Sequence, residues 1–424
     1  MIKIIKAVSS DISNLLSEMK SRSEDVQVEV NKVAADIMDD VRLRGFDAVS
    51  EYSMKFDKAL PRELSSDDLK KAAENCPRDL YNAMKKSAEN IYDYQSRLLA
   101  KSSEWEVYNG SRLGQIVRGL ERVGVYVPGG RAAYPSSVLM NAIPAKVAGV
   151  CEIVMVTPPT ENLNNAVMAA AEIAGVDRVI AVGGVQAVAA MTYGAGFIPK
   201  VDKLVGPGNA FVAAAKRIAF GSLDIDMIAG PSEILIISDG SVNPKIAAAD
   251  MLSQAEHDVL ASAILITTSQ EFAESVAAEL KRQCDMLERK AIIEQALRDY
   301  GAILVCETLE DACSIANDLA PEHLELLTEK PRDLLPLIKN AGAVFLGGNS
   351  PEPLGDYMAG PSHVLPTSGT ARFFSPLSVD SFLKKMSVIE YSEKDLKAVR
   401  DEIEVFAKSE GLTAHANSIK VRFE

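Results

Sequence analysis

The sequence contains only four histidines, and each of them lies close to an acidic or amide side chain. The four pairs are Gln254 with His257, Glu322 with His323, Asp356 with His363, and Glu410 with His415. Imidazole and carboxylate groups can divide the proton transfers of a reaction between them, and they are also common ligands of Zn²⁺. We therefore expect a soluble enzyme whose reaction centre is assembled from these four segments.

Taken singly, most of these pairs also have an ordinary structural explanation. Gln254 and His257 are three residues apart and would share one face of a helix, which also describes a solvated helix end. The second pair could simply begin a helix or strand, and the fourth could be a surface turn. Their joint occurrence favours a site, because two imidazoles, one carboxylate and one weaker oxygen donor suit Zn²⁺. The sequence has no H-E-x-x-H motif, so the ligands would come from segments far apart in the chain.

The third pair lies in residues 347–376, a segment rich in glycine, proline and serine with no periodic pattern. Glycine and proline hold unusual backbone dihedral angles at a cost in chain entropy. A polar loop of this length commonly positions functional side chains. We expect Asp356 and His363 to be positioned in this way, although a purely structural Ω-loop would have the same composition.

Three glycine-rich turns each follow a predicted strand and open a predicted helix, at residues 126–137, 183–188 and 205–211. Backbone N–H groups at such turns and at helix N-termini can bind phosphate. None of the three matches G-x-G-x-x-G, so each alone has little specificity. Three such turns in one half of the chain favour a nucleotide-binding function.

The pattern of the remaining residues predicts an α/β fold. Apolar residues recur at helical spacing in residues 23–45 and again from Pro77 to Leu98, so the first hundred residues are expected to be mainly helical. From Val123 onward, short β-rich runs alternate with helical stretches, which is typical of parallel sheets covered on both faces. Strands are expected at 123–127, 153–157, 178–182 and 203–205, and in a second series at 234–237, 263–267, 302–305 and 343–346. The two series predict two doubly wound halves with a crevice between them, followed by a helical tail from Val379.

The composition limits the classes of partner. Apolar residues make up 47% and charged residues 25% of the 424 residues, a globular balance that suits two or three packed domains. The net charge of −14 argues against nucleic acid or an anionic membrane as the main partner. We find no signal peptide and no membrane-spanning stretch, and the five scattered cysteines suggest a reducing, cytoplasmic environment.

Several longer segments resemble one family closely, the histidinol dehydrogenases. They are GVYVPGGRAAYPSSVLMNAIPAKVAGV, VGPGNAFVAAAKR, AGPSEILI, DMLSQAEHD, APEHLEL, SPEPLGDYMAGPSHVLPTSGTARFFSPLSV and EGLTAHANSIKVR. These strings run from about Gly124 to the C-terminus in the family's order, and they are far more specific than any single motif. The first hundred residues fit only by length and helical character. Ser362 is a departure, because many relatives would have Asn there, but it flanks the loop histidine rather than replacing it.

The resemblance implies a homodimeric zinc enzyme of histidine biosynthesis with one Zn²⁺ per subunit. Such an enzyme oxidises L-histidinol through L-histidinal to L-histidine with two NAD⁺. Matching the motifs residue by residue implies the metal ligands Gln254, His257, Asp356 and His415, and it implies proton transfer by Glu322 and His323. The substrate would contact Ser232, His363 and Glu410 in addition to His323 and the metal ligands. NAD would contact Tyr126, Gln186 and Asn209.

We also expect a definite domain organisation from this resemblance. Residues 1–23 would form an N-terminal helical arm, and residues 379–424 a C-terminal helical part. Residues 24–123 together with 234–378 would form a first α/β domain with the metal and catalytic residues, and residues 124–233 a second α/β domain with the NAD contacts. Both would be doubly wound, incomplete Rossmann-like folds in an intertwined homodimer, so that Glu410 and His415 can serve the partner's site.

A mechanism can be stated for these residues. Because Zn²⁺ has no redox chemistry, hydride must pass to a cofactor. Neutral imidazole is a suitable base near pH 7, so we expect His323 to take the alcohol proton and Glu322 to assist the attack of water on the aldehyde. A thiol route is less favoured, because Cys151 begins a predicted strand and is expected to be buried. The alternative functions are a zinc hydrolase, a catalytically silent α/β binding protein, and a dehydrogenase of the same fold that oxidises another polar alcohol, such as a sulfonated diol.

Overall fold

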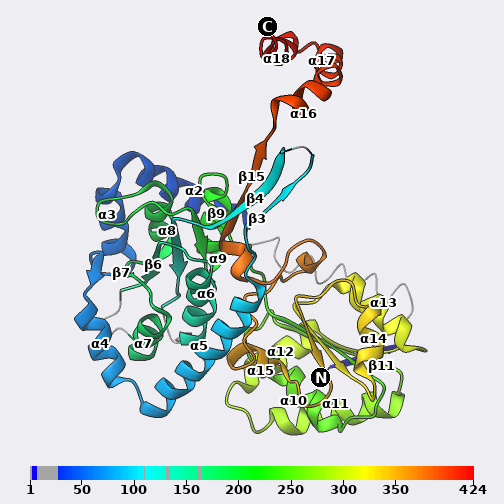
Figure 1. Cartoon of the computed structure of the whole chain (residues 1–424). Helices are drawn as coiled ribbons and strands as arrows, with labels where there is room; N and C mark the ends of the chain where they lie inside the picture. Colours follow the sequence, from blue (N-terminus) through cyan, green and yellow to red (C-terminus); the bar gives the residue numbers. More distant parts are fainter. Residues whose placement is uncertain (1, 7–26, 109, 130–133, 160–163) are drawn as a thin grey trace. The chain divides into compact units, whose positions relative to one another are not determined.

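The computed structural model describes residues 2–6, 27–108, 110–129, 134–159 and 164–424. The chain forms two compact units, which we describe separately (Figure 1). The first unit contains residues 1–98 and 120–382, and the second contains residues 99–119 and 383–424. Within the described ranges no helix combines the length and apolar character needed to cross a bilayer.

Two six-stranded sheets form the framework of the first unit. Sheet I has the order β2-β7-β6-β5-β8-β9, with β2 Arg62–Leu64, β5 Arg122–Tyr126, β6 Glu152–Thr157, β7 Arg178–Ala181, β8 Lys203–Val205 and β9 Asp224–Ile225. Sheet II has the order β1-β12-β11-β10-β13-β14, with β1 Lys3–Lys6, β10 Glu233–Ser238, β11 Ser262–Thr267, β12 Gly301–Val305, β13 His323–Leu327 and β14 Ala343–Leu346. Neighbouring strands are parallel throughout, except that β2 runs antiparallel to β7.

The two sheets share one topology. If the edge strands β2 and β1 are left out and the others are counted along the chain from β5 or from β10, the five remaining strands of each sheet have the spatial order 3-2-1-4-5. In such doubly wound sheets the chain reverses direction across the sheet at one switch point, here between β5 and β8 and between β10 and β13. The predicted α/β class with parallel sheets is therefore confirmed. Strand β13 was not predicted, although it carries the catalytic candidate His323.

The N-terminal helices pack on sheet I. One face of this sheet, with Val154, Val156 and Ile180, packs against α2 Gln27–Arg44, α3 Phe46–Phe56, α8 Gly184–Tyr193 and α9 Ala210–Ala219. A second group, α4 Ser66–Asn75, α5 Arg78–Leu98, α6 Pro135–Val147 and α7 Asn165–Ala174, packs together, and α6 contacts β5 and β6. We expected residues 24–123 to join residues 234–378, but the apolar stripe of α2 packs on α8 and α9, and β2 extends sheet I.

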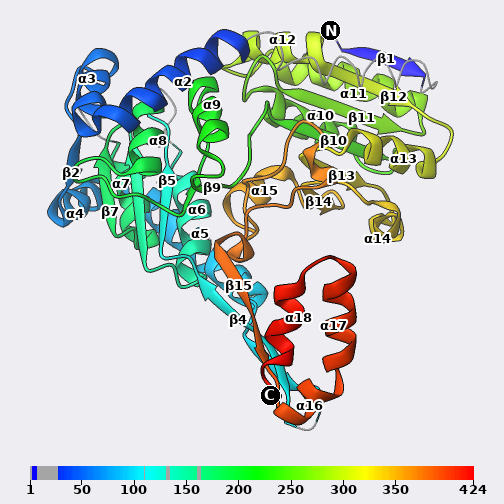
Figure 2. The same cartoon turned by 90° about the horizontal axis from the view of Figure 1, so that it is seen from above.

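Sheet II has helices on both faces (Figure 2). Because side chains alternate along a strand, Ile234 and Ile236 pack against α10 Pro244–Ala255, α11 Gln270–Cys284 and α12 Lys290–Tyr300. Leu235 and Ile237 face α13 Leu309–Leu319 and α14 Pro331–Leu334. The expected N-terminal helical arm is not helical at Lys3–Lys6, which pairs in parallel with β12 as an edge strand. The rest of that arm, residues 7–26, lies outside the described residues.

The second unit combines a small antiparallel sheet with three helices. The strands are β3 Ser103–Glu106, β4 Arg112–Gly119 and β15 Leu383–Glu390, and the helices are α16 Glu393–Ala398, α17 Arg400–Ser409 and α18 Thr413–Lys420. Buried Ser111 donates a hydrogen bond to Asp395 at 2.5 Å and accepts one from the backbone N–H of Ser392 at 3.0 Å, which ties β4 to α16. The predicted helical tail is thus preceded by a strand that pairs with a segment some 270 residues earlier in the chain.

Candidate active site

A pocket of about 390 Å³ lies in the first unit, between the carboxyl ends of sheet I strands and the amino ends of sheet II strands. Pro128 and Gly206 follow β5 and β8, whereas Ser232 precedes β10 and His323 begins β13. Sheet I therefore follows the general rule that ligands bind beyond the carboxyl ends of parallel strands. Sheet II contributes from the opposite end of its strands, which the sequence pattern alone did not predict.

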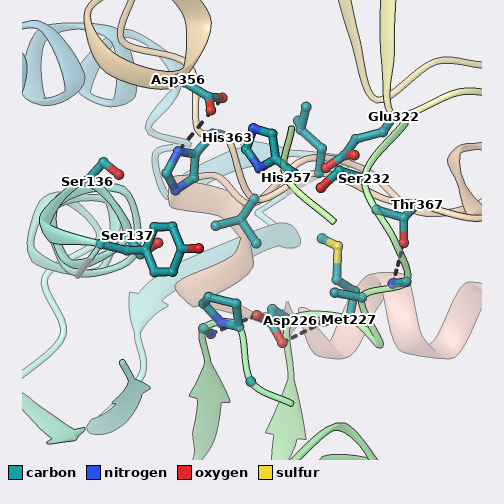
Figure 3. A pocket seen from close by; sticks show the side chains of 18 of the residues that line it. Ser136, Ser137, Asp226, Met227, Ser232, His257, Glu322, Asp356, His363 and Thr367 are labelled. Carbon is teal, nitrogen blue, oxygen red and sulfur yellow. Dashed lines mark hydrogen bonds and ion pairs between the residues drawn. The ribbon is translucent and has the colours of Figure 1, made fainter. Parts of the chain in front are cut away.

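The pocket collects seven of the residues selected from the sequence. They are Ser232, Gln254, His257, Glu322, His323, Asp356 and His363. Figure 3 shows the rings of His257 and His363 projecting into the same space, with Asp356 beside them. Glu410 and His415 belong to the second unit, where both are exposed at the α17–α18 junction. Their part in the site stays a prediction.

His323 has the arrangement of a general base. Its Nδ1 lies 3.0 Å from the backbone carbonyl oxygen of Glu233, and a carbonyl can only accept a hydrogen bond. In the neutral ring Nδ1 must therefore carry the proton, which leaves the lone pair on Nε2. Nε2 is buried and has no hydrogen-bond partner among the described residues. Burial lowers the pKa of His323 to about 4, so the ring is neutral at pH 7 and Nε2 can take a proton.

Glu322 lies beside this imidazole. Its Oε2 accepts a hydrogen bond from the backbone N–H of Glu233 at 2.9 Å and lies 3.7 Å from Nδ1 of His323. Burial raises the pKa of the Glu322 carboxyl well above its usual value. A carboxyl group shifted toward neutrality exchanges protons more readily near pH 7 than an exposed one does. Strand β10 thus holds both proton-transfer candidates through one residue, Glu233.

Asp356 is carried by a short helix, α15 Glu352–Tyr357, inside the glycine- and proline-rich segment. Its Oδ1 lies 3.9 Å from Nδ1 of His363, and burial lowers the pKa of His363. Ser362, the departure from the family pattern, is buried and accepts a hydrogen bond from the backbone N–H of Val364 at 3.1 Å. The segment therefore does position polar side chains in the pocket, as its composition predicted.

Gln254 and His257 come from the end of α10. Helix α10 ends at Ala255, so His257 lies just beyond it rather than on the same helical face, yet both side chains line the pocket. Gln254 is 1% exposed, and its Oε1 has no hydrogen-bond partner within the described part of the chain. A buried amide oxygen without a donor is costly, so it fits a site where a cation completes its coordination.

The sequence reasoning missed a buried acid of this site, Glu352. His323, Glu352 and Asp356 offer ligand atoms that all lie within 4.8 Å of one another. Glu352 is 2% exposed, its Oε1 lies 3.9 Å from Nε2 of His323, and burial raises its pKa to about 8. Its spacing of four residues from Asp356 could have indicated a shared helical face, but Pro351, Pro353 and Gly355 around it concealed the helix.

A neighbouring pocket of about 400 Å³ collects the three residues expected to contact NAD, Tyr126, Gln186 and Asn209. The hydroxyl of Tyr126 accepts a hydrogen bond from the backbone N–H of Gly184 at 3.0 Å, and Asn209 caps helix α9. Pro128 lines both this pocket and the one around His323. Part of the turn at 126–137, residues 130–133, lies outside the described residues. Cys151 is exposed, contrary to the expected burial, and it lines neither pocket.

A buried ion pair fixes the turn between the two pockets. Lys216 and Asp226 form a salt bridge in which both side chains are at most 5% exposed. Lys216 donates to the carbonyl oxygen of Gly206 at 2.9 Å, and the N–H of Gly206 donates to Asp226 at 2.8 Å. Gly206 has φ +107°, and an added Cβ would lie 2.2 Å from the carbonyl oxygen of Tyr126, so only glycine fits this turn.

Comparison with known proteins agrees with this geometry. The family model described as histidinol dehydrogenase matches residues 20–423. The chain belongs to the histidinol dehydrogenase family. It is 53% identical over 427 residues to the histidinol dehydrogenase of Clostridium acetobutylicum, covering all of this chain and 99% of that protein. It is 49% identical to the Heliobacterium mobile histidinol dehydrogenase, with full coverage of both chains.

A solved structure supports the same assignment. The crystal structure of histidinol dehydrogenase from Elizabethkingia anophelis superimposes with a TM-score of 0.93 at 36% sequence identity. The match covers 99% of this chain and 98% of that one. The described part of the N-terminal hundred residues, which resembled the family only in length and helical character, is therefore included in the structural similarity.

Proposed function

We propose that this member of the histidinol dehydrogenase family oxidises L-histidinol through L-histidinal to L-histidine, with two NAD⁺ and one Zn²⁺ per subunit, in histidine biosynthesis. One observation supports this most strongly. Seven side chains selected from segments spread between residues 232 and 363 line a single pocket, and the three NAD candidates line the next one. The five cysteines are unpaired, which is consistent with action in the cytoplasm.

The metal would be held by Gln254, His257 and Asp356, together with the partner subunit's His415. Nitrogen and oxygen donors of this kind suit Zn²⁺, and the unpartnered Oε1 of Gln254 is the clearest sign that the pocket fits a cation. Zn²⁺ in this position would supply Lewis acidity and hold the amine and imidazole of the substrate. His323 with Glu352 and Asp356 is a second possible ligand set. We assign His323 to proton transfer instead, because its lone pair on Nε2 is needed there.

The protein residues then perform two proton transfers. When bound, NAD⁺ would supply the hydride acceptor for each of the two oxidations. Nε2 of His323 would remove the alcohol proton in the first oxidation, and Glu322 would accept a proton from the water that attacks the aldehyde. Oxidation of the alcohol to the carboxylate thus removes two hydrides and three protons and adds one water oxygen. Ser232, His363 and the partner's Glu410 would orient the substrate.

The test couples NADH absorbance to metal analysis. With L-histidinol as limiting substrate we expect two NADH per substrate molecule, and much slower turnover with other amino alcohols or a sulfonated diol. His257→Ala should lose bound zinc, whereas His323→Ala should retain it and lose turnover. If NADH forms only with another alcohol, that alcohol and not L-histidinol is the substrate. Hydrolytic turnover without NADH would overturn the assignment.

A further inference from the structure

The pocket that contains the NAD candidates has a composition of its own. It lies beyond the carboxyl ends of β5, β6, β7 and β8, and so includes the switch point of sheet I between β5 and β8; α2 and the end of α3 also contribute to it. Its walls are mainly apolar, with Val33 and Ile37 from α2 and the partly exposed rings of Phe56 and Phe211. Flat aromatic and aliphatic walls of this kind suit a heteroaromatic base.

This pocket is also separate from the catalytic groups. None of its described lining residues is a histidine or a glutamate, whereas the adjoining pocket contains His323 and Glu322. Hydride transfer requires the nicotinamide to reach the adjoining pocket, which contains His323 and Glu322. Because Pro128 lines both pockets, one dinucleotide can extend from one to the other. The apolar pocket is then left for the adenosine half.

Asp57 is the only charged side chain among the described residues that line the apolar pocket. It follows the end of α3, where its backbone N–H donates to the carbonyl oxygen of Ser53 at 2.8 Å. Its Oδ2 accepts a hydrogen bond from Nε2 of the buried Gln186 at 3.4 Å. Partial burial raises the pKa of Asp57, which reflects a carboxylate facing an apolar space without a cationic partner.

The nearest lysines in the sequence do not change this environment. Lys58 Nζ donates to the carbonyl oxygen of Lys55 at 2.8 Å, and neither lysine lines the pocket. Lys55 Nζ lies 5.3 Å from the ring centroid of Phe56. A carboxylate accepts hydrogen bonds from a ribose diol but repels a phosphate on the same ribose.

We infer that Asp57 selects NAD⁺ over NADP⁺ by accepting hydrogen bonds from the hydroxyls of the adenosine ribose. This inference rests on the proposed NAD-dependent function, and it adds a specificity-determining residue that the family motifs did not indicate. Gln186 orients the carboxylate from the buried side. The free 2′-hydroxyl of NAD⁺ meets an acceptor, whereas the 2′-phosphate of NADP⁺ meets a like charge.

The experiment compares kcat/KM for NAD⁺ and NADP⁺ at saturating L-histidinol in the full-length enzyme. Asp57→Ser should lower kcat/KM with NAD⁺ by about 10- to 100-fold while leaving the value with NADP⁺ unchanged or higher. Asp47→Asn is the matched control, because Asp47 is exposed on helix α3, which ends just before Asp57, and does not line the pocket. It should leave the ratio of the two values unchanged. An equal loss with both cofactors would indicate a merely structural role and overturn the inference.

Binding of fragments gives a readout that does not need turnover. By calorimetry the wild-type protein should bind 5′-AMP more tightly than 2′,5′-ADP, and Asp57→Ser should lose this preference while Asp47→Asn retains it. If L-histidinol gives no NADH but the fragment preference depends on Asp57, the proposed reaction fails and the role of Asp57 stands. A preference that persists in Asp57→Ser would overturn the inference, whatever the substrate.

Discussion

The backbone N–H of Glu352 donates a hydrogen bond to Oε1 of Glu325 at 2.9 Å, in the buried interior beside the pocket that contains His323. Glu325 lies on β13 two residues after His323, and Glu352 begins the helix that carries Asp356. The carboxyl of Asp250, on α10, lies within hydrogen-bonding contact of Glu325. These buried acids therefore join three elements that each contribute side chains to the pocket.

Two substitutions of Glu325 should distinguish the loss of its hydrogen-bond acceptor from the loss of its charge. Glu325→Leu leaves the buried N–H of Glu352 without an acceptor, so the free energy of unfolding should fall by about 1–3 kcal/mol, and kcat should fall because Asp356 shifts. Glu325→Gln keeps an acceptor oxygen and should lose much less stability. Urea unfolding of the metal-free protein measures the free energy of unfolding of the two variants, and the exposed Glu307→Leu is the control. Equal losses for Leu and Gln would mean that the hydrogen bond to Glu352 is unimportant.

The same acids predict a pH dependence of stability. Burial raises the pKa of Asp250 to about 6 from its usual 3.8, so the folded state keeps a proton that the unfolded state has released. The stability contributed by this group is present below pH 3.8 and is lost as the pH rises to about 6. Asp250→Asn should remove this loss, which amounts to at most about 1.4 kcal/mol per pH unit. Urea unfolding of the metal-free protein between these pH values tests it, and an unchanged slope in the variant would contradict the assignment.

The sequence indicated most of the fold because its central strands are buried on both faces. Such strands appear as short Val- and Ile-rich runs between helical stretches, and the predicted boundaries differ from the observed ones by a single residue at β5 and β6. Strand β13 escaped this pattern because its sequence HLELL contains a buried glutamate, Glu325, whose carboxylate accepts a hydrogen bond from the backbone N–H of Glu352, 27 residues later in the chain. Strands β1 and β15 were missed because each is defined by a partner far away in the chain.

The residues of the candidate site could be predicted from sequence motifs, but their arrangement in space could not. Matching the family's motifs selected His257, His323 and Asp356, which line one pocket. Nothing in local spacing indicated that sheet II would contribute from the amino ends of its strands, since that depends on how two sheets pack. Glu352 was overlooked for a similar reason: its chemistry arises from burial beside His323 rather than from its neighbours in the sequence.

Removing one member of the ion pair between Lys216 and Asp226 should lower the free energy of unfolding more than removing both. Asp226→Asn leaves a buried ammonium without its counter-charge, so unfolding should become easier by about 3–5 kcal/mol, and KM for NAD⁺ should rise because Gly206 is released. The double variant Lys216→Met/Asp226→Leu should recover much of the stability but not the KM. The exposed pair Lys290–Asp285 is the control, and Asp285→Asn should leave the free energy of unfolding nearly unchanged, because solvent screens this pair. Recovery of a normal KM in the double variant would show that the pair does not position the turn.

The two residues proposed for proton transfer should affect turnover without affecting metal content. Glu322→Gln and His323→Ala should each lower kcat by roughly 10²- to 10⁴-fold, because in the proposed mechanism each removes a general acid–base group. Zinc content and the thermal unfolding midpoint report whether the pocket is intact. Glu329→Gln, on the exposed residue beyond the far end of β13, is the matched control and should retain full turnover. Near-normal turnover in both catalytic variants would remove these residues from the mechanism.

The assignment of Glu410 and His415 to the partner's site can be tested with hybrid dimers. His415 is exposed on α18, and Phe406 on α17 is 72% exposed, which leaves an apolar surface for a partner to cover. His257→Ala and His415→Ala homodimers should each be inactive. If the tail acts on the other subunit, mixing them by reversible denaturation should restore about one quarter of the wild-type activity, because half of the dimers regain one intact site. If each subunit uses its own tail, every site in the mixture keeps one defect and no activity returns. The His257→Ala variant alone, taken through the same denaturation and refolding, serves as the control.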